Sequence, residues 1–300
     1  TTVFVDYDQF LEHVMTKMSY IQRQLEKELE ARLHQGKALL LYGPRQSGKT
    51  TMLRHFTKRF GDDVLWLNGD NPEVRERLAG IGTSGWRLLL GKSRMLVVDE
   101  AQHIADIGMS LKLVIDEIPE VQVIATGSSA FELMNLTAEP LTGRKREYRL
   151  LPLSFLELSN SSGILEEIQE RERRLLFGSY PDIVSHPGEE PELLSELASS
   201  YLFKDILALE GIRKSERLER LLRALAFQIG SEISFSELSG LVQLDVKTVG
   251  RYLDLLEKCY VIHTLGAYSR NLRNEIKKGL KVYFYDLGIR NAIIGNFSPL

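Results

Sequence analysis

The stretch GPRQSGKT at residues 43–50 has the residue types and the spacing of a loop that binds phosphate. Glycine lets the backbone wrap a phosphate closely, and successive N–H groups at a helix start supply positive potential. Lys49 adds a cation for the outer phosphates, and the Thr50 hydroxyl is suited to binding magnesium. The candidate phosphate-binding residues are Gly43, Pro44, Arg45, Gln46, Ser47, Gly48, Lys49, Thr50 and Thr51. The alternative is a glycine-rich turn that binds no ligand and ends in Lys-Thr by chance.

Two acids follow a second apolar run, in the stretch RMLVVDEAQHI. Asp99 would hold magnesium, and Glu100 would polarise the attacking water, because phosphoryl transfer needs a positioned nucleophile and neutralised charge. Both acids lie close to the phosphate loop if the two strands are central in one sheet. An exposed acidic turn after a buried strand is the alternative. Combined with the loop, the acid pair predicts hydrolysis of a nucleoside triphosphate.

Hydroxyl side chains end a third apolar run, VIATGSSAFEL. Thr126, Ser128 and Ser129 stand where a hydroxyl could reach the terminal phosphate or the attacking water, and we include Ser128 among the catalytic candidates. Capping of the helix that begins at AFELM is the competing role for Ser128 or Ser129.

A cationic stretch, LTGRKREYRLLPLSFLE, begins at residue 141. Arg144 could reach a neighbouring nucleotide and stabilise charge in the transition state. A solvated strand edge, guarded by cations against aggregation, explains Arg144 equally well. We favour this edge role for Lys145, Arg146 and Arg149.

Composition limits the class of protein. The 300 residues carry a net charge of -3 and are 43% apolar, which is enough for packed cores and two domains but gives no overall basic field. Cys259, the only cysteine, excludes an intramolecular disulfide and is most simply a small buried apolar residue. No apolar run approaches the roughly 20 residues that cross a bilayer, and no secretory leader is visible. We expect a cytoplasmic protein with no membrane partner.

Helical and apolar patterns divide the chain into four segments. Residues 1–35 form an N-terminal helical segment, and in residues 36–158 short apolar runs alternate with helices, which indicates a parallel sheet covered on both faces. Residues 159–210 read as a helical lid or linker. In its GSYPD turn, Tyr180 and Pro181 could border a nucleotide base, although a plain helix-ending turn is favoured.

Residues 211–300 give three helices followed by strand-like runs, the order of a winged helix-turn-helix. Its recognition helix would be capped by Asp245 and would present Lys247, Thr248 and Arg251. A basic stretch follows, with Arg270, Arg273, Lys277, Lys278 and Lys281. These cations could neutralise phosphates of duplex DNA with little sequence preference. Docking of a protein partner is the alternative use of such a module.

The motifs together resemble a large family of prokaryotic P-loop ATPases that have an AAA-type core and a C-terminal region of unknown function. The resemblance spans about residues 20 to 295 and rests on GPRQSGKT, LVVDEAQHI, IATGSSAFEL, LTGRKREYRLLPLSFLE, GSYPD and YFYDLGIRNAI. It implies ATP as the nucleotide, Lys49 and Thr50 as ligands of nucleotide and magnesium, Asp99 and Glu100 as the Walker B pair, and Arg144 as an arginine finger. Family members typically continue into a region similar to restriction-type nucleases, which we do not expect within these 300 residues.

We therefore expect an α/β protein with a P-loop NTPase core of AAA or STAND type, built on a parallel sheet and followed by a helical region and a winged helix-turn-helix domain. ATP binding and hydrolysis, with Mg2+, would drive conformational change against a partner, for which DNA is the first choice. The alternative is a STAND-like switch that docks a protein partner and hydrolyses ATP slowly. A homo-oligomer is compatible with both functions.

Overall fold

A five-stranded parallel sheet forms the centre of the N-terminal half of the molecule. The computed structural model describes residues 20–127, 137, 139–199, 215–266 and 280–298. The strands are β1 (Ala38–Tyr42), β2 (Val64–Asn68), β3 (Met95–Asp99), β4 (Gln122–Gly127) and β5 (Lys145–Arg149). Their order across the sheet is β2-β3-β4-β1-β5, and every neighbouring pair is parallel. Because β4 lies between β1 and β3, the carboxyl ends of these three strands meet at one edge of the sheet.

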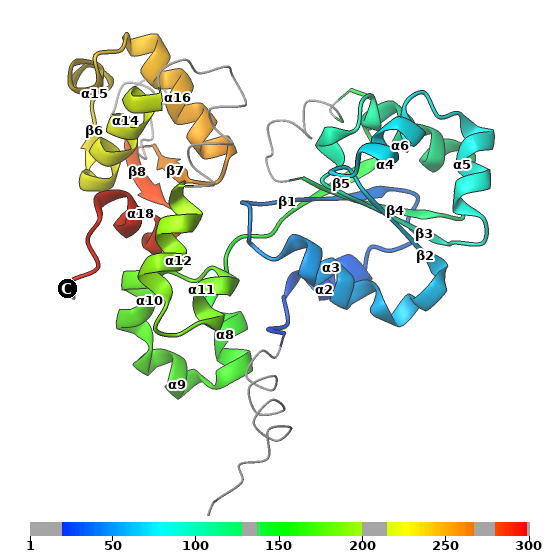
Figure 1. The fold of residues 1–300 in the computed structure, drawn as a ribbon, viewed down its shortest axis with the longest axis horizontal. Coiled ribbons are helices and arrows are strands. Elements are labelled where there is room, and N and C mark those ends of the chain that lie inside the picture. The colour runs from blue at the N-terminus through cyan, green and yellow to red at the C-terminus, as the bar shows by residue number, and fades with distance from the viewer. Residues whose placement is uncertain (1–19, 128–136, 138, 200–214, 267–279, 299–300) are drawn as a thin grey trace, which may run out of the picture.

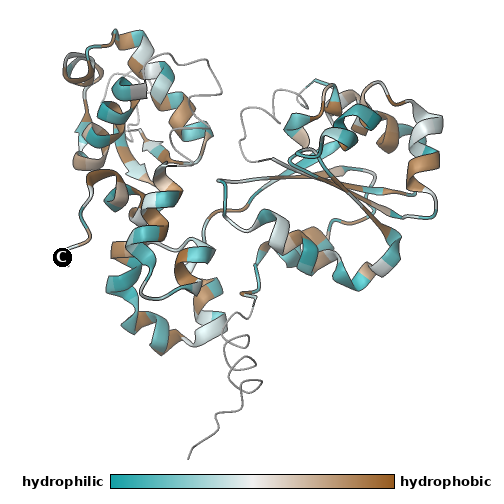
Figure 2. Ribbon diagram, in the orientation of Figure 1, coloured by the Kyte–Doolittle hydropathy of each residue, from teal (hydrophilic) through white to brown (hydrophobic). Residues whose placement is uncertain are grey.

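Helices cover both faces of this sheet (Figure 1). On one face lie α2 (Leu25–Glu30) and α3 (Lys49–Thr57), and on the other lie α4 (Pro72–Leu78), α5 (Thr83–Leu90) and α6 (Ile107–Glu117). Leu39 and Leu41 pack toward α2 and α3, while Leu40 and Tyr42 pack into the opposite core. Strands buried on both faces are apolar without alternation, which explains the continuous run ALLLY (Figure 2).

The cationic segment that begins at Lys145 is the edge strand of the sheet, as the sequence predicts. β5 pairs with β1, and the strand order places it at the end of the sheet. Its residues are half-buried or exposed, whereas those of β1 are all buried. Charged side chains on such an edge oppose pairing with another chain.

A helical region follows the sheet. It contains α8 (Phe155–Ser162), α9 (Ile164–Gln169), α10 (Arg171–Phe177), α11 (Pro181–Ser185) and α12 (Glu190–Leu197). Ser154 and Glu157 form a reciprocal capping box at the start of α8, which explains why the helix begins there.

The C-terminal part has three helices and a small antiparallel sheet. Its elements are α14 (Ser215–Phe227), β6 (Glu232–Ile233), α15 (Phe235–Val242), α16 (Val246–Lys258), β7 (Ile262–Leu265), β8 (Leu280–Phe284) and α18 (Leu287–Ile294). The strand order is β6-β8-β7. The Asp245 carboxylate accepts a hydrogen bond from the Thr248 N–H (2.9 Å), which confirms the predicted cap of α16.

The helical region and the C-terminal part share one hydrophobic core. Tyr180, Ile183 and Leu194 from the helical region belong to the same buried cluster as Leu221 and Leu256 from α14 and α16. α18 returns to pack against α10, α12 and α14. The two segments that the sequence divides near residue 210 are therefore packed as one body. Within the described parts of the chain, no helix is long and apolar enough to traverse a lipid bilayer.

Candidate functional site

The phosphate loop joins the carboxyl end of β1 to the start of α3, and two of its positions require glycine. A Cβ on Gly43 would lie 2.0 Å from the Leu150 carbonyl oxygen, so no larger residue fits beside the chain that leaves β5. Gly48, the N-cap of α3, has φ +89°, a left-handed conformation that glycine adopts without strain. The loop therefore places successive backbone N–H groups at a helix N-terminus.

Lys49 is buried under this loop. Its Nζ donates hydrogen bonds to the carbonyl oxygens of Gly43 (2.9 Å) and Pro44 (2.8 Å). Burial lowers the pKa of Lys49 to about 8, and the nearby carboxylates of Glu100 and Asp99 act in the opposite direction. In the free protein two loop carbonyls are the partners of the ammonium group. A ligand with more negative charge would replace them as its partner.

The acid pair meets the phosphate loop through two threonine hydroxyls. Asp99 Oδ2 accepts a hydrogen bond from Thr50 Oγ1 (2.8 Å), and Asp99 Oδ1 accepts one from Thr126 Oγ1 (2.5 Å). Thr126 Oγ1 also accepts a hydrogen bond from the Glu100 N–H (3.1 Å). The ends of β3 and β4 and the start of α3 are therefore joined at a single buried carboxylate, which is 5% exposed.

The threonine and aspartate oxygens suit a magnesium ion. Mg2+ prefers hard oxygen ligands and commonly uses one or two carboxylates together with substrate phosphates. The Thr50 hydroxyl and the Asp99 carboxylate, 2.8 Å apart, form such a donor set beside the phosphate loop. The residues present thus fit the predicted ion.

Of the three hydroxyls considered at the end of β4, the structure places Thr126 in this network. Ser128, the catalytic candidate, and Ser129 lie outside the described residues. Thr126 is fully buried. Its place as the penultimate residue of β4, level with the acid pair, is the signal in the sequence that could have favoured Thr126 over the two serines.

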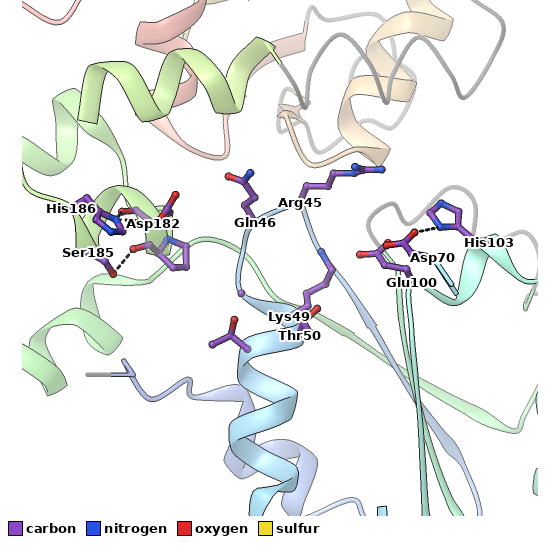
Figure 3. A pocket seen from close by; sticks show the side chains of 13 residues that line it. Arg45, Gln46, Lys49, Thr50, Asp70, Glu100, His103, Asp182, Ser185 and His186 are labelled. Atoms are coloured by element: carbon purple, nitrogen blue, oxygen red, sulfur yellow. Dashed lines mark hydrogen bonds and ion pairs between the residues drawn. The ribbon is translucent and has the colours of Figure 1, made fainter. Parts of the chain in front are cut away.

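A cleft of about 490 Å³ opens over the loop between the sheet and the helical region (Figure 3). Its lining residues are Arg45, Gln46, Gly48, Lys49, Thr50, Thr51, Asp70, Glu100, His103, Pro181, Asp182, Ser185 and His186. Figure 3 shows Asp182, Ser185 and His186 on one side of the loop, with Asp70, Glu100 and His103 on the other. The cleft therefore brings six of the predicted loop residues and Glu100 together, and adds side chains that the motifs did not indicate.

Histidines stand on both sides of the cleft. On the sheet side, His103 Nδ1 lies 2.7 Å from Asp70 Oδ1. On the helical side, the Asp182 carbonyl oxygen, 2.9 Å from His186 Nδ1, raises the pKa of His186 together with the Asp182 carboxylate. Both rings are about one-third exposed, so either can respond to a ligand in the cleft.

A second, smaller cavity of about 220 Å³ adjoins the loop and the cleft. It is lined by Tyr20, Ile21, Arg23, Gly48, Thr51, Leu153, Pro181 and Ser185. The GSYPD turn follows the end of α10 at Phe177, as the favoured interpretation had it, and its Pro181 also lines both cavities. Tyr180 instead lies in the hydrophobic core shared by the helical region and the C-terminal part.

Arg23, which lines the smaller cavity, supports the loop, and nothing in the motifs pointed to it. Arg23 is 4% exposed, and its Nη1 donates to the Ser47 carbonyl oxygen (2.8 Å). Its Nε pairs with Glu157 (3.1 Å), the buried acid of the α8 capping box. The Ser-x-x-Glu spacing could have marked Glu157 as a capping residue, but no local pattern joins it to Arg23.

Arg144 lies at the opposite end of the sheet from the cleft. It precedes Lys145, which pairs with Ala38 at the start of β1, whereas the phosphate loop leaves the far end of β1 after Tyr42. Arg144 Nε donates to Asp116 Oδ1 of α6 (2.6 Å). Arg144 therefore does not reach the nucleotide site of its own chain.

The predicted DNA-binding cations are only partly described. Lys247 and Arg251 are exposed on α16, and Lys281 is exposed on β8. Arg270, Arg273, Lys277 and Lys278 lie outside the described residues. Cys259 is buried in the shared core, as expected.

Comparison with known proteins divides the chain into two parts. Residues 35–159 match the family described as "AAA domain", and residues 168–300 match a family described as "Domain of unknown function". Residues 35–159 form an AAA-type P-loop domain. The family that matches residues 168–300 has no described activity.

Two relatives that match most of the chain are described only as uncharacterized proteins. A protein of Mycobacterium tuberculosis is 27% identical over 278 residues, covering 91% of this chain and 60% of that protein. A protein of Haemophilus influenzae is 26% identical, covering 85% of this chain and 69% of that protein. The chain thus spans about 60% of the length of the mycobacterial relative.

A solved structure, the Thermotoga maritima RuvB Holliday junction branch migration motor, superposes with a TM-score of 0.39 and 15% identity, over 89% of this chain and 94% of that one. That score is too low to define a shared arrangement.

Proposed function

We propose that this protein binds ATP with Mg2+ and hydrolyses it, and that the nucleotide cycle moves the C-terminal part relative to a partner. The observation that carries the proposal is the network in which Thr50 and Thr126 both donate to Asp99, directly before Glu100. It links the phosphate loop to an acid pair, the combination that phosphoryl transfer to water requires.

Each residue of the site has a role in this proposal. The loop N–H groups and Lys49 bind the phosphates, and Thr50 and Asp99 hold the magnesium ion, which offsets phosphate charge when bound. Glu100 orients the attacking water and accepts its proton. Thr126 fixes the directions of Asp99 and of the Glu100 backbone.

The smaller cavity is the proposed place of the nucleotide base. It adjoins Gly48 and Thr51 of the loop and includes the apolar side chains of Ile21, Leu153 and Pro181. A base needs a largely apolar pocket with few polar groups. The choice of adenine rests on the resemblance of the motifs to P-loop ATPases.

DNA is the proposed partner of the C-terminal part. Three helices followed by an antiparallel sheet of order β6-β8-β7 support a winged helix-turn-helix, with α16 as the recognition helix. Lys247 and Arg251 on this helix and Lys281 on β8 supply exposed cations. Contacts of this kind give binding that depends on salt more than on sequence.

A protein partner is the second candidate, favoured by two apolar side chains. Leu241 is 56% exposed and Val246 is 46% exposed, one on each side of the turn between α15 and α16. Exposed apolar groups at this position would suit a protein surface better than DNA phosphates. In that case the protein is a switch with slow turnover that nucleic acid does not change.

A second copy of the chain is the proposed source of an arginine for the site. Arg144 lies far from its own cleft and about 41% exposed, beside Asp116. It could reach only the nucleotide of a neighbouring copy, where its charge would stabilise the transition state.

Steady-state ATP turnover, measured with and without linear, forked and four-way DNA, tests the proposal.

Lys49→Ala should abolish nucleotide binding, because it removes the buried cation. Glu100→Gln should keep binding but reduce turnover strongly, because the amide cannot accept the proton. Normal turnover in Glu100→Gln would remove Glu100 from the role of base, and turnover unaffected by DNA would favour the switch.

A further inference from the structure

We propose that Gln102 is a positioning residue that fixes the Glu100 carboxylate for its reaction with water. The inference rests on the proposed function, in which Glu100 is the base. Gln102 Nε2 donates a hydrogen bond to Glu100 Oε2 at 2.7 Å. Gln102 is only 9% exposed and does not line the cleft, so it acts on the nucleotide site through Glu100.

The backbone of Glu100 is fixed independently of Gln102. Glu100 has φ +48° and ψ +46°, a left-handed conformation that is uncommon for a residue with a side chain. Its N–H donates to Thr126 Oγ1, and its carbonyl oxygen accepts from the His103 N–H (3.2 Å). These bonds anchor the main chain but leave the side-chain torsions of Glu100 free.

The chain turns so that Gln102 can restrict those torsions. Directly after Glu100, residues 101–103 form the 3₁₀ helix η2 (Ala101–His103), a tight turn that brings the amide of Gln102 back to the carboxylate. A long charged side chain that must hold one geometry loses rotamer entropy. A buried amide donor offsets that loss, because hydrogen bonds to charged groups are stronger than neutral ones.

The hydrogen bond from Gln102 uses one of the two carboxylate oxygens of Glu100. Glu100 Oε2 accepts from Gln102, whereas Oε1 receives no hydrogen bond from the residues that the structure describes. Glu100 lines the cleft opposite the helical region (Figure 3). The arrangement therefore leaves a carboxylate oxygen to accept a proton from water at the terminal phosphate.

Gln102→Met tests this inference, because methionine keeps the length of the side chain and removes the donor. The expected result is a fall in kcat of roughly 10- to 100-fold, with KM and the affinity for a non-hydrolysable ATP analogue unchanged. A fall in kcat of less than threefold, or a loss of nucleotide affinity that matches the fall in kcat, would overturn the inference.

Gln122→Met is the matched control for loss of a buried glutamine. Gln122, 3% exposed, donates from Nε2 to the Lys37 and Val123 carbonyl oxygens at the start of β4, the end of the strand remote from Glu100. Gln122→Met should lower the unfolding temperature but leave kcat unchanged. If it reduces kcat as much as Gln102→Met does, the effect of Gln102 is general destabilisation and the inference fails.

The double variant with Glu100→Gln separates this inference from the proposed function. If Gln102 acts through Glu100, adding Gln102→Met to Glu100→Gln should reduce kcat no further. A further fall of the same size as in the wild-type background would show that Gln102 acts elsewhere and would overturn the inference. Normal turnover in Glu100→Gln alone would instead contradict the proposed function.

Discussion

Two buried cations fix the phosphate loop from different directions. Lys49 donates to the Gly43 and Pro44 carbonyls from within the loop, and Arg23 donates to the Ser47 carbonyl from the N-terminal segment. Arg23 is itself neutralised by Glu157. In the free protein the carbonyl oxygens of Gly43, Pro44 and Ser47 therefore all accept hydrogen bonds from these two side chains. The loop is arranged before a phosphate binds, which reduces the cost of ordering it on binding.

The lowered pKa of Lys49 predicts that nucleotide binding takes up a proton at alkaline pH. In the free protein Lys49 is charged below its pKa of about 8 and loses its proton above it. A polyphosphate favours the charged form, so affinity should be constant near pH 7 and fall by up to about tenfold per pH unit well above pH 8. Calorimetric titration at about pH 8.5 in buffers of different ionisation enthalpy measures the proton uptake.

Lys49→Arg is the control for this prediction. Arginine stays charged throughout this range of pH, so its complex should form without proton uptake, whatever its affinity. Equal proton uptake in Lys49→Arg and wild type would assign the proton to another group in the cleft.

At the scale of elements, hydrogen bonds to one carboxylate join the start of α18 to the turn that precedes α11. The Asp286 carboxylate caps α18 by accepting from the Ile289 N–H (3.2 Å) and also accepts from the N–H of Ser179 (2.7 Å), two residues before α11. The Ser179 carbonyl oxygen accepts from the Leu153 N–H (2.8 Å), beside the smaller cavity. The GSYPD and YDLGIRN motifs are therefore two halves of one junction next to the nucleotide site.

Gly178→Ala should destabilise this junction. A Cβ at Gly178, where φ is +72°, would lie 1.9 Å from Asp286 Oδ1, and the bonds to Ser179 and Ile289 keep that carboxylate from moving aside. We expect a loss of about 3 kcal/mol or more in the free energy of unfolding. Urea denaturation followed by circular dichroism measures the loss.

Gly188→Ala separates the clash from backbone strain. Gly188 also has positive φ, +103°, but a Cβ there would meet nothing within 4 Å. Its substitution should cost only the strain of the left-handed conformation, roughly 1 to 2 kcal/mol. Equal losses in Gly178→Ala and Gly188→Ala would mean that the Asp286 contact adds nothing.

Elements were predictable from sequence where the determining pattern is local. Apolar runs predicted the parallel sheet, and the loop spacing predicted the junction of β1 with α3, because strand burial and helix N-termini depend on neighbouring residues. Two contacts that support the site join residues far apart in the sequence: Arg23 with Glu157, 134 residues apart, and Ser179 with Asp286, 107 residues apart. No local sequence pattern links the members of either pair. Their contacts depend on how the helices pack, which periodicity does not specify.

At the scale of the whole molecule, the cleft joins the two packed bodies of the chain. Lys49, Thr50 and Glu100 come from the AAA-type domain, whereas Asp182 and Ser185 lie in α11 and His186 directly follows it. α11 packs in the core shared with the C-terminal part. Pro181 at the start of α11 would be only 3.6 Å from a Cβ on Gly48. We therefore expect a ligand that changes the loop to displace α11, which shares a hydrophobic core with α16.

If this coupling serves DNA, reversing charge on the C-terminal part should weaken binding in a way that salt reveals. Lys247→Glu with Lys281→Glu removes two exposed cations, from α16 and β8. Each lost phosphate contact should flatten the plot of log affinity against log salt by about 0.9, so we expect a change of slope near 2 in fluorescence anisotropy with duplex DNA. Lys92→Glu, an exposed site on the AAA-type domain, should leave the slope unchanged because it changes charge away from α16. The same slope in all three proteins would assign the exposed face of α16 to a protein partner.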